Sequence, residues 1–269
     1  PTRSSQRRPP AMRVRLALHS DRWFKRLMNA MRVAHQGAWL GLFRVEDIAQ
    51  ANSAAYAQWD RYLNADYNRS GLADWEHDAA VGYFPPDSAI LVASAGAGRE
   101  VLGLERLGYH PVGFDPSFEL VAQGRRFLES EGSTAELLLS PPDHVPPGIE
   151  GPFGGVLVGW GGYIHIYTRT ARVSFLRELR ALVDHNAPMV LSFFLRMPED
   201  RSFTATQRIA LFVRALRRSR EPIEPGDTIE GTFDHHFTWD EIESELTDGG
   251  FSVVESSSAP YPHVVCRAV

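Results

Sequence analysis

One stretch in the first half of the chain constrains its fold more than any other. Residues 90–93 form an apolar run typical of a strand buried on both faces. They lead into 94–98, a turn of serine, alanine and glycine whose small side chains let a ligand reach the backbone. Residues 99–107 then show helical spacing, and a second short strand, 111–114, stops at Asp115. This order predicts a nucleotide-binding βαβ unit in which the acid hydrogen-bonds ribose hydroxyls.

Strands and helices continue to alternate along the chain, and such alternation implies right-handed crossovers and a parallel sheet. Two apolar segments at the C-terminus, separated by serine and proline, predict a closing antiparallel hairpin. The fold class expected is therefore α/β, with a Rossmann-like, seven-stranded, mostly parallel sheet and a C-terminal antiparallel hairpin. The strands are expected at residues 90–93, 111–114, 135–139, 155–160, 189–195, 251–254 and 263–269.

The chain is expected to divide into a tail, a cap and a core. Residues 1–20, rich in proline, serine and arginine, are expected to be a disordered tail. Residues 21–84 carry amphipathic helical patterns and are expected to form a helical N-terminal cap. Residues 85–269 form the core, with a helical insertion after the fifth strand that serves as a lid at about 198–227. A sheet covered in this way favours an enclosed pocket and a small-molecule acceptor.

Finer expectations concern the helices of the cap and the insertion. Gly37 and Gly41 are expected to end the first cap helix, because glycine lowers helix stability. The next helix is expected to run over residues 45–63. A helix over 203–218 in the insertion is expected to turn its arginines, Arg214 among them, to solvent.

Composition excludes several classes of protein. The net charge of −5 gives no electrostatic case for binding nucleic acid. The single cysteine, Cys266, rules out an internal disulfide and a CxxC metal site, and its apolar surroundings indicate a buried structural thiol. No stretch has the roughly 18 to 20 apolar residues of a membrane helix, and the arginines of the N-terminus precede no apolar signal segment. We therefore expect a cytoplasmic protein with no membrane partner, and the oligomeric state stays open.

The glycines of the turn distinguish between nucleotide cofactors. The third glycine of a GxGxxG fingerprint would fall at Val101, which disfavours a nicotinamide dinucleotide. Residues 90–100 resemble instead the cofactor loop of class I S-adenosylmethionine-dependent methyltransferases of the small-molecule type. Gly96 and Gly98 match the last two glycines of the family motif. The chain departs from the family at Val92, where an acid is usual, and at Ser94, where the first glycine would stand.

The resemblance extends over residues 85–269 and implies S-adenosyl-L-methionine as cofactor. The family's fourth-strand motif matches 156–160, and its last helix and hairpin match 237–269. Because the acid at Val92 is missing, another element should hold the methionine end of the cofactor, and we expect Tyr67 and Arg69 there; packing and solvation are their plain alternatives. The residues expected to bind the cofactor are Tyr67, Arg69, Ser94, Ala95, Gly96, Gly98, Asp115, Pro116, Gly159 and Trp160.

A methyl acceptor with a hydroxyl or a protonated amine needs a base near neutrality, and histidine fits best. His165 is the first candidate, because it follows the fourth strand at the sheet end where α/β folds place ligands. His235 and His236 are second candidates, at the return of the insertion. Each of them has an alternative as an ordinary hydrogen-bonded histidine. No metal is expected, since neighbours on a strand point to opposite faces and no further ligands stand nearby.

These observations leave more than one function open. The leading expectation is S-adenosylmethionine-dependent methyl transfer to an oxygen or nitrogen of a small-molecule acceptor. The departures at Val92 and Ser94 allow a methyltransferase-like binding module without turnover. The glycines together with Asp115 also allow an NAD-dependent oxidoreductase. The identity of the acceptor is not encoded in any motif of the chain.

Overall fold

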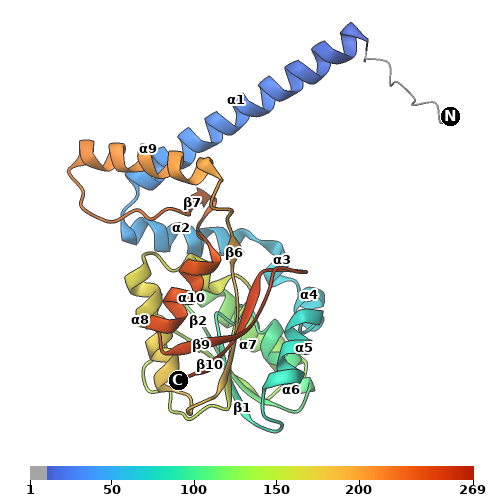
Figure 1. The fold of residues 1–269 in the computed structure, drawn as a ribbon. Coiled ribbons are helices and arrows are strands. Elements are labelled where there is room, and N and C mark those ends of the chain that lie inside the picture. The colour runs from blue at the N-terminus through green and yellow to red at the C-terminus, as the bar shows by residue number, and fades with distance from the viewer. Residues whose placement is uncertain (1–10) are drawn as a thin grey trace, which may run out of the picture.

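A seven-stranded sheet runs through the body of the molecule (Figure 1). The computed structural model describes residues 11–269. The strand order is β3-β2-β1-β4-β5-β10-β9, and all neighbours are parallel except β10, which is antiparallel to both β5 and β9. The expected fold class is thus confirmed. The strands are β1 (Ala89–Ala93), β2 (His110–Asp115), β3 (Glu136–Leu139), β4 (Gly155–Val158), β5 (Pro188–Ser192), β9 (Phe251–Ser257) and β10 (His263–Ala268).

The strand order reverses at β1, which lies between β2 and β4. In register, Leu91 of β1 stands beside Val112 of β2 and Val156 of β4. The loops that leave the carboxyl ends of β1 and β4 therefore depart in opposite directions and leave a crevice between them, which is where open α/β sheets bind ligands.

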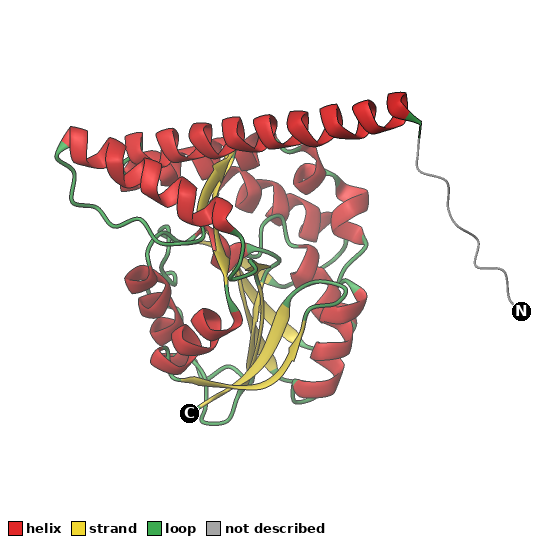
Figure 2. Ribbon diagram, turned by 45° about the horizontal axis from the view of Figure 1, so that its top comes forward, coloured by secondary structure: helices red, strands yellow, loops and turns green. Residues whose placement is uncertain are grey.

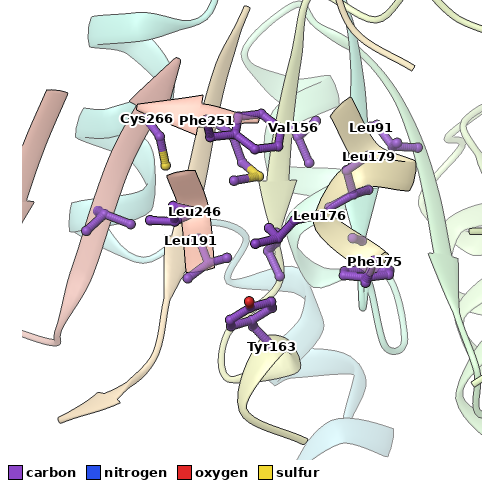
Figure 3. Close-up of a cluster of buried hydrophobic side chains, with 14 of the residues drawn as sticks. Leu91, Val156, Tyr163, Phe175, Leu176, Leu179, Leu191, Leu246, Phe251 and Cys266 are labelled. Carbon is purple, nitrogen blue, oxygen red and sulfur yellow. The ribbon is translucent and has the colours of Figure 1, made fainter. Parts of the chain in front are cut away.

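Alternate residues of the central strands pack on the two faces of the sheet. One face, with Leu91 and Val156, packs against α8 and α10, and Cys266 is buried among them as a structural thiol (Figure 3). The other face, with Ile90 and Val92, packs against α5, α6 and α7. The helices of these two layers are α5 (Asp74–Tyr83), α6 (Arg99–Arg106), α7 (Phe118–Ser130), α8 (Arg169–Ala181) and α10 (Trp239–Asp248).

The first helix, α1 (Met12–Leu42), differs from the expectation in two ways. It begins at Met12, so the second half of the expected tail is helical; residues 1–10 lie outside the described residues. It also runs through Gly37 and Gly41 without a break. A Cβ built on Gly37 would lie 2.7 Å from the Cβ of Ile209, and one on Gly41 would lie 2.5 Å from the Cβ of Val213. These glycines allow close packing on α9 (Arg201–Arg217) instead of ending the helix.

The rest of the cap consists of short helices above the sheet. The helix expected over 45–63 divides at Trp59 into α2 (Val45–Gln58) and α3 (Asp60–Leu63), and the following turn contains α4 (Ala65–Arg69). Asn64 starts α4 by accepting hydrogen bonds from two backbone amides of its first turn.

The insertion after β5 contributes a helix and a second sheet. Helix α9 (Arg201–Arg217) packs side by side with α1 across one end of the molecule (Figure 2). Its Arg214 is buried and donates to the carbonyls of Leu40, Glu221 and Pro222, so the expectation that this arginine faces solvent is wrong. A three-stranded sheet follows, in the order β6-β8-β7, made of β6 (Phe194–Leu195), β7 (Asp227–Glu230) and β8 (Thr232–Phe237). In residues 11–269 no helix combines the length and apolarity needed to cross a membrane.

Candidate active site

A cavity of about 620 Å³ lies at the carboxyl ends of β1, β2 and β4, beneath α2. Its size is in the usual range for a site that encloses a small molecule. Its floor comes from the turn after β1 and from the end of β2, and its roof comes from α2 and the segment 162–167. One cavity therefore joins the expected nucleotide cradle to the cap.

The turn after β1 exposes its backbone to the cavity. Gly96 has φ +52°, and a Cβ placed on it would meet no atom within 4 Å, so the space in front of this residue is open. Asp115, at the end of β2, accepts hydrogen bonds from the backbone N–H of Gly96 at 2.9 Å and of Ser117 at 2.8 Å. Each carboxylate oxygen keeps a further lone pair that can accept a ribose hydroxyl. Burial raises the pKa of Asp115 to about 6.

Ser94 occupies the position of the first glycine in the methyltransferase loop motif, and its surroundings accommodate the larger residue. Its φ is +53°, in the left-handed region that glycine adopts without strain. Room for its side chain comes from Gly162, because a Cβ at that position would overlap the Cβ and Oγ of Ser94. A Cβ on Gly159 would overlap the carbonyl oxygen of Ser94. The missing glycine is thus compensated by glycines in the loop after β4.

The cavity brings together most of the residues expected to bind the cofactor, but not all of them. Gly98 and Gly159 lie behind the cavity wall, where they permit close packing. Arg69 is also outside the lining, and its guanidinium pairs with Asp66 at 2.7 Å and with Glu131 at 2.9 Å. The expected residues that line the cavity are Tyr67, Ser94, Ala95, Gly96, Asp115, Pro116, Trp160 and His165.

The arginine in the cavity wall is Arg99, and it belongs to a buried ion cluster. It forms a bidentate pair with Glu76, at 2.8 and 2.9 Å, and contacts Glu100 at 2.5 Å. A fourth bond, of 2.7 Å, runs to the carbonyl of Gly71. Burial raises the pKa of Glu76, and the paired carboxylates raise that of Arg99 against the effect of burial. With two carboxylates and one guanidinium, the cluster favours a cation in the cavity over an anion.

His165 lies at the end of η1 (Gly162–His165), the 3₁₀ helix that follows β4. Its Nδ1 is 2.8 Å from the carbonyl oxygen of Phe233 and 3.1 Å from a carboxylate oxygen of Asp234. Because a carbonyl only accepts, Nδ1 carries the proton, and the lone pair of Nε2 faces Tyr56 and the cavity. Burial raises the pKa of Tyr56 well above its usual value, so its hydroxyl stays protonated and donates to Nε2.

His235 and His236 do not line the cavity, so the structure does not support them as bases acting on a ligand there. His235 is 2% exposed in β8 and shares a hydrogen bond of 2.7 Å with Asp227. Burial lowers the pKa of His235 to about 3 and raises that of Asp227 to about 7. The ring of His236 lies between Phe194 and Phe203, at centroid distances of 5.2 and 5.1 Å. Both histidines serve the packing of the small sheet.

The ligand atoms of Glu224, Asp227 and His235 lie within 4.8 Å of one another, which is a spacing that metal sites share. The guanidinium of Arg172 already pairs with Glu224 at 2.6 Å and with Glu245 at 2.7 Å. A buried cation of the protein therefore balances the acids of this cluster, and we assign it a structural role.

Several residues of the cavity were not among the expected site residues. Asn52 and Tyr56 follow the buried Ile48 at four-residue intervals on α2, so they share its inward face. Polar residues on the inward face of an amphipathic helix were the feature of the sequence that could have indicated these two site residues. Asn52 accepts from the backbone N–H of Phe233 at 2.8 Å. Asp143 lines the cavity as well, and burial raises its pKa to about 6.

Comparison with known proteins agrees with this architecture. No family model matches the chain, and no curated protein matches it in sequence. Among solved structures, an S-adenosylmethionine-dependent methyltransferase from Methanosarcina mazei is 17% identical, with a TM-score of 0.56 over 74% of this chain and 99% of that one. Magnesium protoporphyrin IX methyltransferase from Synechocystis, with bound S-adenosylhomocysteine, is 17% identical, with a TM-score of 0.52 over 82% of this chain and 97% of that one.

A third structure, 1,6-didemethyltoxoflavin-N1-methyltransferase from Burkholderia thailandensis, is 18% identical, with a TM-score of 0.50 over 71% of this chain and 74% of that one. At identities this low, structural similarity establishes the fold, and the chemistry has to be argued from the residues of the site. The chain has the Rossmann-like fold of the class I S-adenosylmethionine-dependent methyltransferases, with a cavity where that fold binds its ligands.

Proposed function

We propose that this protein is an S-adenosylmethionine-dependent methyltransferase that acts on an oxygen or nitrogen of a small acceptor molecule. The observation that carries the proposal is the shared cavity, in which the open backbone of Gly96 and the carboxylate of Asp115 lie together with Nε2 of His165, which accepts a hydrogen bond from Tyr56. A cradle for a nucleoside and a base for an acceptor are the two parts that such a transfer requires.

The residues of the floor fit the cofactor. Asp115 accepts the ribose hydroxyls through the lone pairs that Gly96 and Ser117 leave unused. The excess negative charge of the cluster around Arg99 supports Glu100 as the group that receives the ammonium of the methionine end. Glu100 thereby takes the role of the acid missing at Val92, and it lines the cavity from α6. When bound, S-adenosylmethionine supplies a methyl group that is already activated for transfer.

The residues of the roof handle the acceptor. Nε2 of His165 accepts the acceptor's proton while the carbonyl of Phe233 and the carboxylate of Asp234 hold the Nδ1–H side of the ring. Asp234 also stabilises the imidazolium that results. Tyr56 donates to Nε2 in the resting site, so the acceptor's hydroxyl or amine takes over the place of the Tyr56 hydroxyl.

The walls favour a flat, largely apolar acceptor. Tyr62, Trp160 and Tyr167 contribute aromatic side chains to the same cavity. Two of the similar solved structures are methyltransferases named for ring compounds, magnesium protoporphyrin IX and 1,6-didemethyltoxoflavin. An acceptor of this chemical type is consistent with the cavity, over which α2 lies.

Calorimetric titration with S-adenosylhomocysteine tests the cofactor assignment, and we expect saturable binding that Asp115→Asn weakens. Arg69→Gln is the matched control, because Arg69 lies outside the cavity and its loss should leave the affinity unchanged. No heat of binding at millimolar ligand, together with quenching of tryptophan fluorescence by reduced nicotinamide dinucleotide, would reject a methyltransferase in favour of an oxidoreductase. Binding without methyl transfer to any of a broad panel of phenols, amines and heteroaromatic acceptors would indicate a binding module.

A further inference from the structure

The first half of α1 projects from the body of the molecule (Figure 1). Every side chain described between residues 12 and 32 is exposed, and Val33 is the first that is buried. The helix runs parallel to α9, with Gly37 opposite Thr206 and Gly41 opposite Ala210. The projecting part therefore extends past the start of α9 by about 30 Å at 1.5 Å per residue.

The projecting helix carries an apolar face that nothing in the described chain covers. Phe24, Leu27, Met28 and Met31 follow one another at helical three- and four-residue spacing and are all exposed, Phe24 to 55%. Trp23 beside them is 62% exposed. A continuous apolar face on a helix that stands in water marks a binding surface for a partner.

The adjoining helix α9 adds to this surface. Its Phe212 and Leu216 are exposed to 65% and 70%, on the side of α9 away from the core. Trp39 and Leu42 of α1 are exposed as well, at the end where the two helices pack together. Figure 2 shows both helices lying across the same end of the molecule. We call this end of the molecule, residues 12–42 and 201–220, the α1–α9 layer.

The charge of the α1–α9 layer is opposite to that of the remaining chain. The layer holds 12 of the 28 basic residues and one of the 33 acidic residues, although the whole protein has a net charge of −5. On α1, the basic side chains of Arg22 and Arg26 lie on the opposite side of the helix from Phe24 and Met28. Such a layer matches an anionic partner that also accepts apolar side chains.

We propose that the α1–α9 layer docks on the surface of an anionic lipid bilayer, with α1 lying flat in the interface. The apolar face enters the boundary between headgroups and acyl chains, while the exposed basic side chains of Arg22, Lys25 and Arg26 reach the phosphates. The tryptophans occupy the depth that amphipathic rings prefer. A helix that lies on a bilayer needs no 18-residue apolar span, so the sequence criterion that predicted no membrane partner does not apply to it.

A second copy of the chain fits this surface less well. Pairing two α1 helices would bring together two segments that each carry six basic residues and one acid. In residues 43–200 and 221–269, the large exposed apolar side chains are spread over separate elements, so the acidic part of a second copy presents no matching apolar face. A nucleic acid would complement the positive charge of the layer but would leave the apolar side chains of Leu27, Met28 and Met31 exposed to water.

Sedimentation with vesicles tests the proposal on the protein of residues 1–269. We expect binding to vesicles of phosphatidylcholine with 30% phosphatidylglycerol, and at least tenfold weaker binding to phosphatidylcholine alone. The double variant Phe24→Ser/Met28→Ser should abolish binding, and Arg22→Glu/Arg26→Glu should weaken it at least tenfold. Val81→Ser and Arg126→Glu are matched controls, since they remove an exposed apolar and an exposed basic side chain elsewhere.

Circular dichroism of each variant confirms that the core remains folded, as expected for positions that are exposed on α1. Equal binding to neutral and anionic vesicles would overturn the proposal. So would light scattering that shows a dimer which Phe24→Ser/Met28→Ser converts to monomer while vesicle binding persists. Displacement of α1 from vesicles by a short RNA at physiological salt would point to nucleic acid and would likewise contradict it.

Discussion

At the scale of single residues, His165 is the point where binding and chemistry meet. Its Nδ1 is committed to the carbonyl of Phe233, which leaves Nε2 as the basic atom at the cavity. Asp234, 3.1 Å from Nδ1, favours the charged ring that forms when a proton arrives. The ring therefore has both a fixed tautomer and a partner for its protonated form.

Replacing His165 separates its role as a base from any role in cofactor binding. His165→Asn should lower kcat by about 10²- to 10⁴-fold, the usual contribution of general base catalysis. The affinity for S-adenosylhomocysteine should change little, because the cradle at Gly96 and Asp115 does not contact the ring. Steady-state kinetics and calorimetry on the same preparation measure both. His235→Asn tests the assignment by contrast, because it should impair stability and leave kcat per folded molecule unchanged.

The carboxyl of Asp115 makes cofactor binding depend on pH. Its pKa is raised by burial to about 6, and the ionised form is the better acceptor for ribose hydroxyls. As pH falls through 6 the competent form is lost, so the Kd for S-adenosylhomocysteine should rise about tenfold between pH 7 and pH 5. Calorimetry at several pH values gives the profile. An Asp115→Asn variant with the same pH profile would show that another group is responsible.

At the scale of elements, glycines decide how closely segments approach. Gly159 and Gly162 follow β4 and accommodate Ser94, whose left-handed backbone would suit glycine better. In α1, Gly37 and Gly41 bring two helices into contact. In each case a glycine on one element makes room for a residue on another. The role of such a glycine therefore depends on how two elements pack together.

The pair Ser94 and Gly162 can be tested by a double-mutant cycle. Gly162→Ala alone should destabilise the protein by about 1–3 kcal/mol, because its Cβ overlaps the side chain of Ser94. Ser94→Gly/Gly162→Ala should recover most of this loss. Gly159→Ala is the control that Ser94→Gly should not rescue, since its Cβ meets the backbone oxygen of Ser94. Urea denaturation midpoints measure the cycle, and independent effects at 94 and 162 would disprove the coupling.

Helix α1 offers a second comparison at this scale. Alanine normally stabilises a helix relative to glycine by about 0.5–1 kcal/mol. Gly82→Ala in α5 should show that gain, because no atom lies within 4 Å of the new Cβ. Gly37→Ala should instead cost about 1–2 kcal/mol, since its Cβ would lie 2.8 Å from the carbonyl oxygen of Thr206. Thermal unfolding distinguishes the two, and a stabilised Gly37→Ala would contradict the packing described for α1 and α9.

The cavity and helix α1 show which features could be predicted from the sequence and which could not. Gly96 and Asp115 were found because they lie within one βαβ unit, where order along the chain implies position in space. Tyr56 and Phe233 are 109 and 68 residues away from the His165 they hold, and no local pattern relates them. Glycines in α1 were expected to end the helix because propensity is a local quantity, and the contact with α9 overrides it.

At the scale of the whole molecule, the chain combines a Rossmann-like core with further segments that complete the cavity. The core sheet followed from periodicity and turn residues, which are properties of short windows. The small sheet β6-β8-β7 did not, because β6 has two residues and pairs with β8 across the insertion. The places of His235 and His236 depend on that sheet, so their position in the sequence did not indicate that they lie outside the cavity lining.

Truncation tests whether the projecting helix is independent of the body. A chain that begins at Met31 should keep the unfolding temperature within about 2 °C and bind S-adenosylhomocysteine as before, since the side chains described for residues 12–30 of α1 are exposed. A chain that begins at Val45 should be less stable, because it lacks the buried Val33 and Leu40. Scanning calorimetry of both compares them. A large loss on removing residues 1–30 would mean that this segment packs on the body in solution.

The hydrogen bonds that fix the His165 ring limit which segments of the chain can be exchanged. One ring nitrogen is bound by β8 from the insertion and the other by α2 from the cap, and Asn52 of α2 bonds the same stretch of β8. Neither segment can be exchanged for that of a relative without disturbing the base. The cap and the insertion therefore fix the base together, so a chimera that exchanges only one of them should lose the position of the His165 ring, whereas one that exchanges both should keep it.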